Sequence, residues 1–160
     1  MPQIKHIRDL KLMHQQTHQL VKYCCEQIIR LDNDNDSMSM LILPFLSAVE
    51  LGIHEIVEEI LASYPPAISF GDSEQHVALH LAVINRRQNV FNLIFQMGEY
   101  KQFLSMHTDK YKNNILHLAG KLAPLHRRNL VSGAALQMQR ELQWFKVRIF
   151  TPNHYERSQK

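Results

Sequence analysis

Three aspartates near the first fifth of the chain have a spacing that could support metal chemistry. Asp32, Asp34 and Asp36 show the Asp-x-Asp-x-Asp pattern that opens a calcium-binding loop. Such a loop also needs Gly at its sixth position and Glu at its twelfth, where this chain has Ser37 and Leu43. We therefore interpret the three aspartates as part of a polar linker.

A second group that could bind a metal lies upstream. His14 and His18 are four residues apart, a spacing that can bind zinc from one face of a helix. No Glu completes a His-Glu-x-x-His motif, and Cys24 and Cys25 face different directions on a helix. The adjacent cysteines also do not suit a mutual disulfide. The histidines are therefore interpreted as helix surface, and no metal site is predicted.

A nucleophilic serine would be the third possibility. Ser132 lacks the Gly-x-Ser-x-Gly pattern of a nucleophile elbow, and we expect it to cap the helix that follows. The chain also lacks a phosphate-binding glycine loop. The sequence thus predicts no enzymatic activity, no cofactor and no small-molecule substrate.

The elements that carry these residues are predicted to be helices. The chain has 160 residues, of which 45% are hydrophobic and 21% are charged, with five glycines and six prolines. Leu, Ile, Met, Gln, Glu and Lys favour helices, so we expect an all-α protein. The net charge is +3, and the basic groups Arg86–Arg87 and His126–Arg128 are interpreted as solvated surface rather than as a nucleic-acid interface.

Targeting signals are not evident. Residues 2–11 are too polar for a secretory signal, and the apolar run Met40–Leu46 is too short to cross a membrane. We expect a cytoplasmic protein with reduced thiols, which reaches the cytoplasmic face of a membrane only through partners.

Three segments of the chain repeat one pattern. Leu43–Ala48, Val77–Ala82 and Asn114–Ala119 end in alanines that lie 34 and 37 residues apart. The second and third segments keep a Leu-His-x-Ala core, and the first keeps a Pro and the Ala. This pattern resembles the Thr-Pro-Leu-His-x-Ala signature of the ankyrin repeat, which is about 33 residues long. We expect a solenoid of about three repeats with short hairpin loops.

The resemblance assigns roles to the motif residues. It implies that the alanines let neighbouring inner helices approach, that the leucines fill the core between repeats, and that the histidines tie adjacent hairpin loops together. The expected structural positions are Ala48, Gly52, Leu79, His80, Ala82, Leu116, His117 and Ala119. Helix pairs are expected at 44–51 with 54–62, 78–85 with 88–97, and 115–122 with 131–146.

The hairpins depart from the family at one position. Asp72 and Asp109 start them, as in many ankyrin repeats, but Gln75 and Lys112 replace the usual glycine. Because a non-glycine residue at positive φ is strained, the sequence predicts irregular hairpins.

The remaining segments complete the domain organisation. Helical spacing of apolar residues predicts one amphipathic helix near 5–31, roughly 40 Å long, that caps the stack. We therefore divide the chain into a capping helix at 1–31, a polar linker at 32–40, repeats at 41–146, and a divergent flexible tail at 147–160.

The third repeat carries a more specific resemblance. Asn113–Pro124 and Val131–Lys146 are similar to plant ankyrin proteins with a C-terminal PGG domain, and the similarity covers residues 8–146. In that family a cytoplasmic stack precedes membrane-spanning helices, and relatives are linked to defence, cell death and salt stress. The chain departs at Val147, so we expect a truncated, spliced or degenerate member without the membrane anchor.

The resemblance implies a protein–protein interaction module in stress, defence or cell-death signalling. A truncated regulatory form that pairs with full-length membrane-anchored relatives is the alternative. The apolar residues on the concave face would form a groove for a partner or be covered by the N-terminal helix or the tail. The expected partner-binding residues are Ser73, Glu74, His76, Leu81, Ile84, Asn85, Lys110, Tyr111, Asn113, Leu118 and Lys121.

Overall fold

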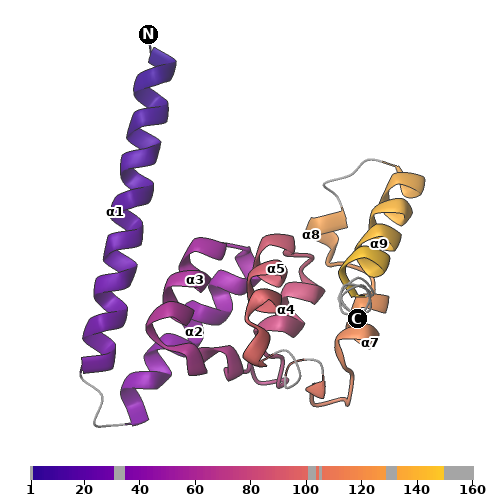
Figure 1. Cartoon of the computed structure of the whole chain (residues 1–160). Coiled ribbons are helices and arrows are strands. Elements are labelled where there is room, and N and C mark those ends of the chain that lie inside the picture. The colour runs from indigo at the N-terminus through magenta and orange to yellow at the C-terminus, as the bar shows by residue number, and fades with distance from the viewer. Residues whose placement is uncertain (1, 31–34, 101–103, 105, 129–132, 150–160) are drawn as a thin grey trace, which may run out of the picture.

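The computed structural model describes residues 2–30, 35–100, 104, 106–128 and 133–149. Within these residues the regular structure is helical, with one isolated bridge between Gly71 and Val77. Figure 1 shows a row of short helices flanked by one long helix. The expectation of an all-helical protein is therefore confirmed for the described residues.

The long N-terminal helix α1 runs from Pro2 to Arg30, close to the predicted 5–31. It packs on α2 and α3 through its C-terminal half, where Cys25 is buried and Val21 and Ile28 are partly buried. Its N-terminal half extends past α3, and residues 5–20 are exposed (Figure 1). This helix thus covers the first end of the stack.

The second helix begins earlier than the sequence suggested. Helix α2 spans Asn35–Leu51, so residues 35–40 of the predicted linker 32–40 are helical, while residues 31–34 lie outside the described part. Leu41, Phe45 and Val49 recur at every fourth position and are buried, which gives the helix one continuous apolar face. The polar start that resembled a linker consists of residue types that also favour helix N-termini.

The α2–α3 turn depends on Gly52. Its φ is 81°, and its amide nitrogen lies 2.9 Å from the carbonyl oxygen of Ala48. A β-carbon on Gly52 would lie 2.7 Å from Cδ of Arg87, so both the conformation and the space call for glycine. Gly52 thus follows the last residue of α2, at the position where the repeat motif predicted a helix-ending glycine.

The later helices follow the expected pairs. Helix α3 spans His54–Ser63, α4 spans Ala78–Ile84, and α5 spans Gln88–Gln96. The third unit has α7 at Ile115–Gly120, a short α8 at Leu125–Arg128, and α9 at Ala134–Ile149. Short 3₁₀ segments lie at Pro65–Ser69 (η1) and Gly98–Tyr100 (η2).

The inner helices form a row in which α4 contacts both α2 and α7. The outer helix α5 lies beside α3, and α9 packs on α7 (Figure 1). Ala48, Ala82 and Ala119 are buried, as the motif predicted. A larger side chain at any of these positions would hold the inner helices apart.

Two apolar residues expected at the concave surface are instead part of the core. Leu81 is 3% exposed and Leu118 is 2% exposed, and Ile84 is half-buried. The prediction of an open apolar groove at these residues is therefore wrong. The long helix α1 does not account for the burial of Leu81 and Leu118, because it packs principally against α2 and α3.

The expected core leucine of the third unit is also different. Leu79 is 1% exposed, but Leu116, at the same motif position, is 43% exposed. The physical reason is that Leu79 lies on α4, which contacts both α2 and α7, whereas the described residues place no further inner helix beyond α7. Leu116 is thus at the open face of the stack.

Candidate functional site

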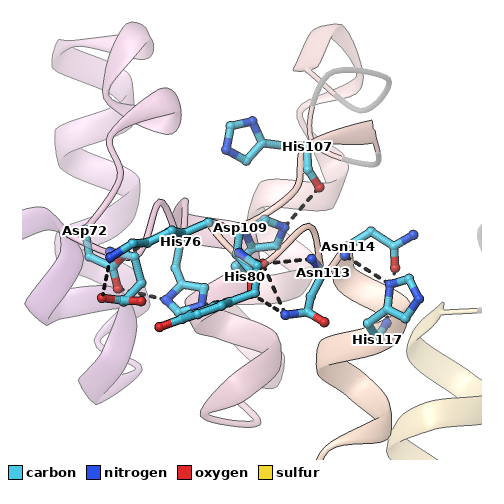
Figure 2. Close-up of polar contacts among 11 residues, drawn as sticks. Asp72, His76, His80, His107, Asp109, Asn113, Asn114 and His117 are labelled. Atoms are coloured by element: carbon cyan, nitrogen blue, oxygen red, sulfur yellow. Dashed lines mark hydrogen bonds and ion pairs between the residues drawn. The ribbon is translucent and has the colours of Figure 1, made fainter.

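The hairpins at 72–76 and 109–113 are built alike (Figure 2). Oδ1 of Asp72 accepts hydrogen bonds from the backbone nitrogens of Glu74 and His76, both at 2.8 Å. Oδ1 of Asp109 accepts from the corresponding nitrogens of Tyr111 at 2.8 Å and Asn113 at 2.7 Å. Each aspartate therefore organises its own turn.

The residues that replace the hairpin glycine adopt its conformation. Gln75 has φ 62° and Lys112 has φ 61°. Their amides donate to the carbonyl oxygens of Asp72 at 3.0 Å and Asp109 at 2.9 Å. The predicted irregularity is wrong, because the aspartate hydrogen bonds hold both turns in the same strained geometry.

His76 joins the two hairpins (Figure 2). Its Nδ1 lies 2.9 Å from Oδ2 of Asp72, and its Nε2 lies 3.5 Å from Oδ2 of Asp109. Its side chain is only 16% exposed, so the predicted role of His76 as a partner contact gives way to a bridge within the protein. The sequence did not indicate this bridge, because Asp109 lies 33 positions further along the chain.

The electrostatics of both aspartates follow from these bonds. Burial alone would raise the pKa of Asp109, but hydrogen bonds from Asn113 and Tyr111 stabilise the carboxylate and lower its pKa overall. The pKa of Asp72 is also lowered, since hydrogen bonds from His76 and Glu74 outweigh the opposing effect of burial. Both side chains are therefore structural anions.

His80 makes the tie between loops that the motif predicted. Its Nε2 lies 3.2 Å from the carbonyl oxygen of His107, in the segment that leads to the second hairpin, and the residue is fully buried. Burial, followed by the positive charges of His107 and His76, lowers the pKa of His80 to about 4. His80 is thus a neutral hydrogen-bond donor at neutral pH.

His117 behaves differently from His80. It is exposed, and its Nδ1 accepts a hydrogen bond from the backbone nitrogen of Asn114 at 3.2 Å. The side chain of Asn114 accepts in return from the nitrogens of Leu116 and His117. His117 therefore caps its own helix α7 rather than tying hairpin loops, which corrects the predicted role.

The hairpin tips carry the exposed side chains of the predicted surface. Ser73 and Lys110 are exposed, and Tyr111 is 66% exposed. The amide of Lys110 donates to the carbonyl oxygen of Glu74 at 2.9 Å, and Nζ of Lys110 lies 3.6 Å from Oε1 of Glu74. A side-chain hydrogen bond with Glu74 and its negative charge raise the pKa of Tyr111. Glu74, Lys110 and Tyr111 therefore form one polar cluster across both tips.

The other residues predicted to contact a partner differ in their exposure. Asn113 donates to Oδ2 of Asp109 at 2.8 Å, and Asn85 donates to the carbonyl oxygen of Leu81 at 3.1 Å. Both asparagines are half-buried, and their bonds hold the protein together. Lys121 follows α7 and is exposed.

Arg86 is a structural residue that the sequence interpretation missed. It is buried, although the pair Arg86–Arg87 was interpreted as solvated surface. The φ of Arg86 is 54°, and its guanidinium donates to the carbonyl oxygens of Ala119 and Lys121 and to the carboxylate of Glu141. Arg87 in turn donates to the carbonyl oxygen of Glu50 at 2.5 Å.

The residues considered for metal or nucleophilic chemistry do not assemble. His14 lies 3.4 Å from Glu55 and His18 lies 3.4 Å from Glu59, so each pairs with a carboxylate of α3. Among the described residues, no cluster of three or more metal-ligating side chains is present. Burial, followed by the negative charge of Glu59, raises the pKa of Cys25, which does not favour a reactive thiolate. Ser132, Asp32 and Asp34 lie outside the described residues.

None of the helices in the described ranges combines the length and the apolar character needed to span a bilayer. Comparisons with family models, curated proteins and solved structures gave no match for this chain.

Proposed function

We propose that this chain is an ankyrin-type repeat stack that binds a protein partner through its hairpin tips. The observation that carries the proposal is the pair of equivalent hairpins joined by His76, which lies between Asp72 and Asp109. Repeated hairpins fixed on stacked helix pairs give a continuous surface that other side chains can use for recognition.

The exposed residues on this frame suit protein recognition. Tyr111 presents a large amphipathic ring at the second tip, and tyrosines are frequent among the residues that dominate binding energies. The backbone beneath it is already held by Asp109, so little conformational entropy is lost on binding. Ser73, Lys110 and Glu74 complete a polar rim that would tune association rates. Lys121 follows the C-terminal end of α7, so it is left out of the hairpin-tip surface. Leu81 and Leu118 are left out of this surface because they are buried.

The biological setting comes from the sequence resemblance. Similarity to plant ankyrin proteins with a PGG domain favours a cytoplasmic role in stress, defence or cell-death signalling. We propose binding without catalysis, since Asp72, His76, His80 and Asp109 are committed to hydrogen bonds within the protein.

The test is affinity capture from a plant extract. The double variant Lys110→Ala with Tyr111→Ala is expected to lose the specific partner while keeping the melting temperature of the wild type. The matched control is Lys22→Ala with Tyr23→Ala, because both residues are exposed on α1 and Tyr23 is 59% exposed. Retained capture by a folded tip variant, or equal loss in the control, would contradict the proposal.

A second function is favoured by the open face at Leu116. Leu116 is 43% exposed, against 1% for Leu79, and we propose that another ankyrin unit stacks on this face. A regulatory form that pairs with membrane-anchored relatives would use this face. Leu116→Lys should then abolish co-purification with the ankyrin region of such a relative, whereas the tip variant should not.

A further inference from the structure

A cavity of about 490 Å³ lies where α7, α8 and α9 meet. Figure 1 shows α8 and α9 facing one another above α7. The volume of the cavity is within the range of small-molecule sites, about 300–1,000 Å³. The charged part of the lining comes from Lys121, Arg127, Arg128, Arg140 and Glu141, and Gln137 adds an uncharged polar side chain.

The charge of this region is strongly unbalanced. Between Ala119 and Phe150 the sequence contains one acidic residue, Glu141. Oε2 of Glu141 lies 2.6 Å from Nη2 of Arg86, so this carboxylate is already neutralised by a cation outside the cavity lining. The four cations of the lining therefore have no carboxylate of their own within this stretch of sequence.

Two of these cations are also incompletely hydrogen-bonded. Nε of Arg127 and Nε of Arg128 are buried donors without a partner among the described residues. Leaving a buried donor unpaired is unfavourable unless a ligand or water satisfies it. Burial, followed by the positive charge of Arg140, lowers the pKa of Arg127, as expected where two like charges lie near one another. An anion placed among these guanidinium groups would offset their mutual repulsion.

Most of the remaining lining is apolar and open. Leu122, Met138 and Leu142 are each more than half exposed, and Phe145 also lines the cavity. Methionine and leucine side chains at such a surface adapt to flexible aliphatic groups. The cavity thus combines an anion-attracting cluster with a wall that favours hydrocarbon.

We propose that this cavity binds a single-chain anionic amphiphile, with a carboxylate or phosphate head among Arg127, Arg128 and Arg140 and an alkyl chain along Leu122, Met138 and Leu142. Charge-assisted hydrogen bonds to the guanidinium groups fix the head, and burial of the chain adds hydrophobic stabilisation. This site is separate from the hairpin tips of the proposed function, so either can fail without the other.

The experiment is calorimetric titration of the full chain with decanoate and decyl phosphate as probes. The expected dissociation constant lies between about 10 μM and 1 mM for at least one head group. Decanol and acetate test the tail and the head alone, and each should bind at least about tenfold more weakly. Comparing the two anionic probes distinguishes a carboxylate source from a phosphate source. Equal binding of decanol, or no binding of either anionic probe, would overturn the proposal.

Variants test the position of the head. Arg128→Ala with Arg140→Ala should weaken binding of the better probe at least about tenfold. The matched control, Arg8→Ala with Arg30→Ala, removes the same charge from exposed positions on α1 and should leave binding unchanged. If the double variant does not fold, amide chemical shifts of the wild type give an independent measurement. They should change around α7, α8 and α9 on adding the probe, and changes confined to other helices would refute the site.

Discussion

Nη2 of Arg86 lies 2.6 Å from Oε2 of Glu141, a residue 55 positions further along the chain. The same nitrogen lies 2.6 Å from the carbonyl oxygen of Lys121 and 3.2 Å from that of Ala119. The guanidinium carbon is also 5.8 Å from the centre of the Trp144 ring. One arginine from the turn after α4 therefore holds the end of α7 and the middle of α9.

Replacing Arg86 should destabilise the protein strongly. Arg86→Ala is expected to lower the free energy of unfolding by about 3 kcal/mol, because it leaves Glu141 and two helix-end carbonyls without their donor. Urea denaturation measures this change. Arg30→Ala, at an exposed position of α1, should change the value by less than about 0.5 kcal/mol. A similarly small effect for Arg86→Ala would show that its hydrogen bonds do not support the third unit.

Enlarging the central alanine should disturb the row of inner helices. Ala82 is fully buried on α4, which contacts α2 and α7. Ala82→Leu should cost about 1–3 kcal/mol by overpacking this contact. Ala135→Leu, at an exposed position of α9, is the control and should be nearly neutral. An unchanged melting curve for Ala82→Leu would rule out close helix packing at this position.

The strained hairpin positions should tolerate glycine. Gln75→Gly and Lys112→Gly are each expected to be neutral or to stabilise by up to about 1 kcal/mol, since relief of a positive φ offsets the added freedom of the unfolded chain. Ser73→Gly is the control, because Ser73 is not at positive φ, and it should destabilise slightly. Thermal melting in one buffer compares all three. If Gln75→Gly and Lys112→Gly both lower the melting temperature more than Ser73→Gly does, the strain argument is contradicted.

Acid should weaken the protein through His80. Its pKa is about 4 in the folded state, below the ordinary value of 6.5, so between these values the unfolded chain binds a proton that the folded chain does not. Stability should therefore be full above pH 6.5 and fall as the pH drops toward 4, by up to about 1.4 kcal/mol per pH unit from this group. Urea titrations across this range measure the slope.

A variant separates His80 from the other titrating groups. His80→Gln should be less stable at pH 7 but should show a shallower loss between pH 6.5 and 4. The lowered pKa values of Asp72 and Asp109 act at more acidic pH, since their stabilisation is lost only as the pH falls below the ordinary aspartate value. An unchanged slope in His80→Gln would mean that burial of His80 does not control the acid response.

Local patterns in the sequence were sufficient for the helices and for several motif roles. The spacing of apolar residues predicted the long N-terminal helix, because helical periodicity depends on neighbours three or four residues apart. The repeat motif predicted the helix pairs. The motif also accounts for three single residues. Gly52 has the positive φ of a helix-ending glycine, Ala82 is small and buried, and His80 contacts the neighbouring loop.

Roles that depend on distant residues were decided by the tertiary structure alone. Leu81 and Leu118 became core, and His76 became a bridge, because the stacking of helices brought α4, α7 and the second hairpin together. Leu116 stayed exposed where its counterpart Leu79 is covered. Arg86 acquired its partners only when α9 folded back over α7. Burial and ion pairing are properties of the whole packed chain, and a side chain's own type and neighbours do not determine which distant groups it will meet.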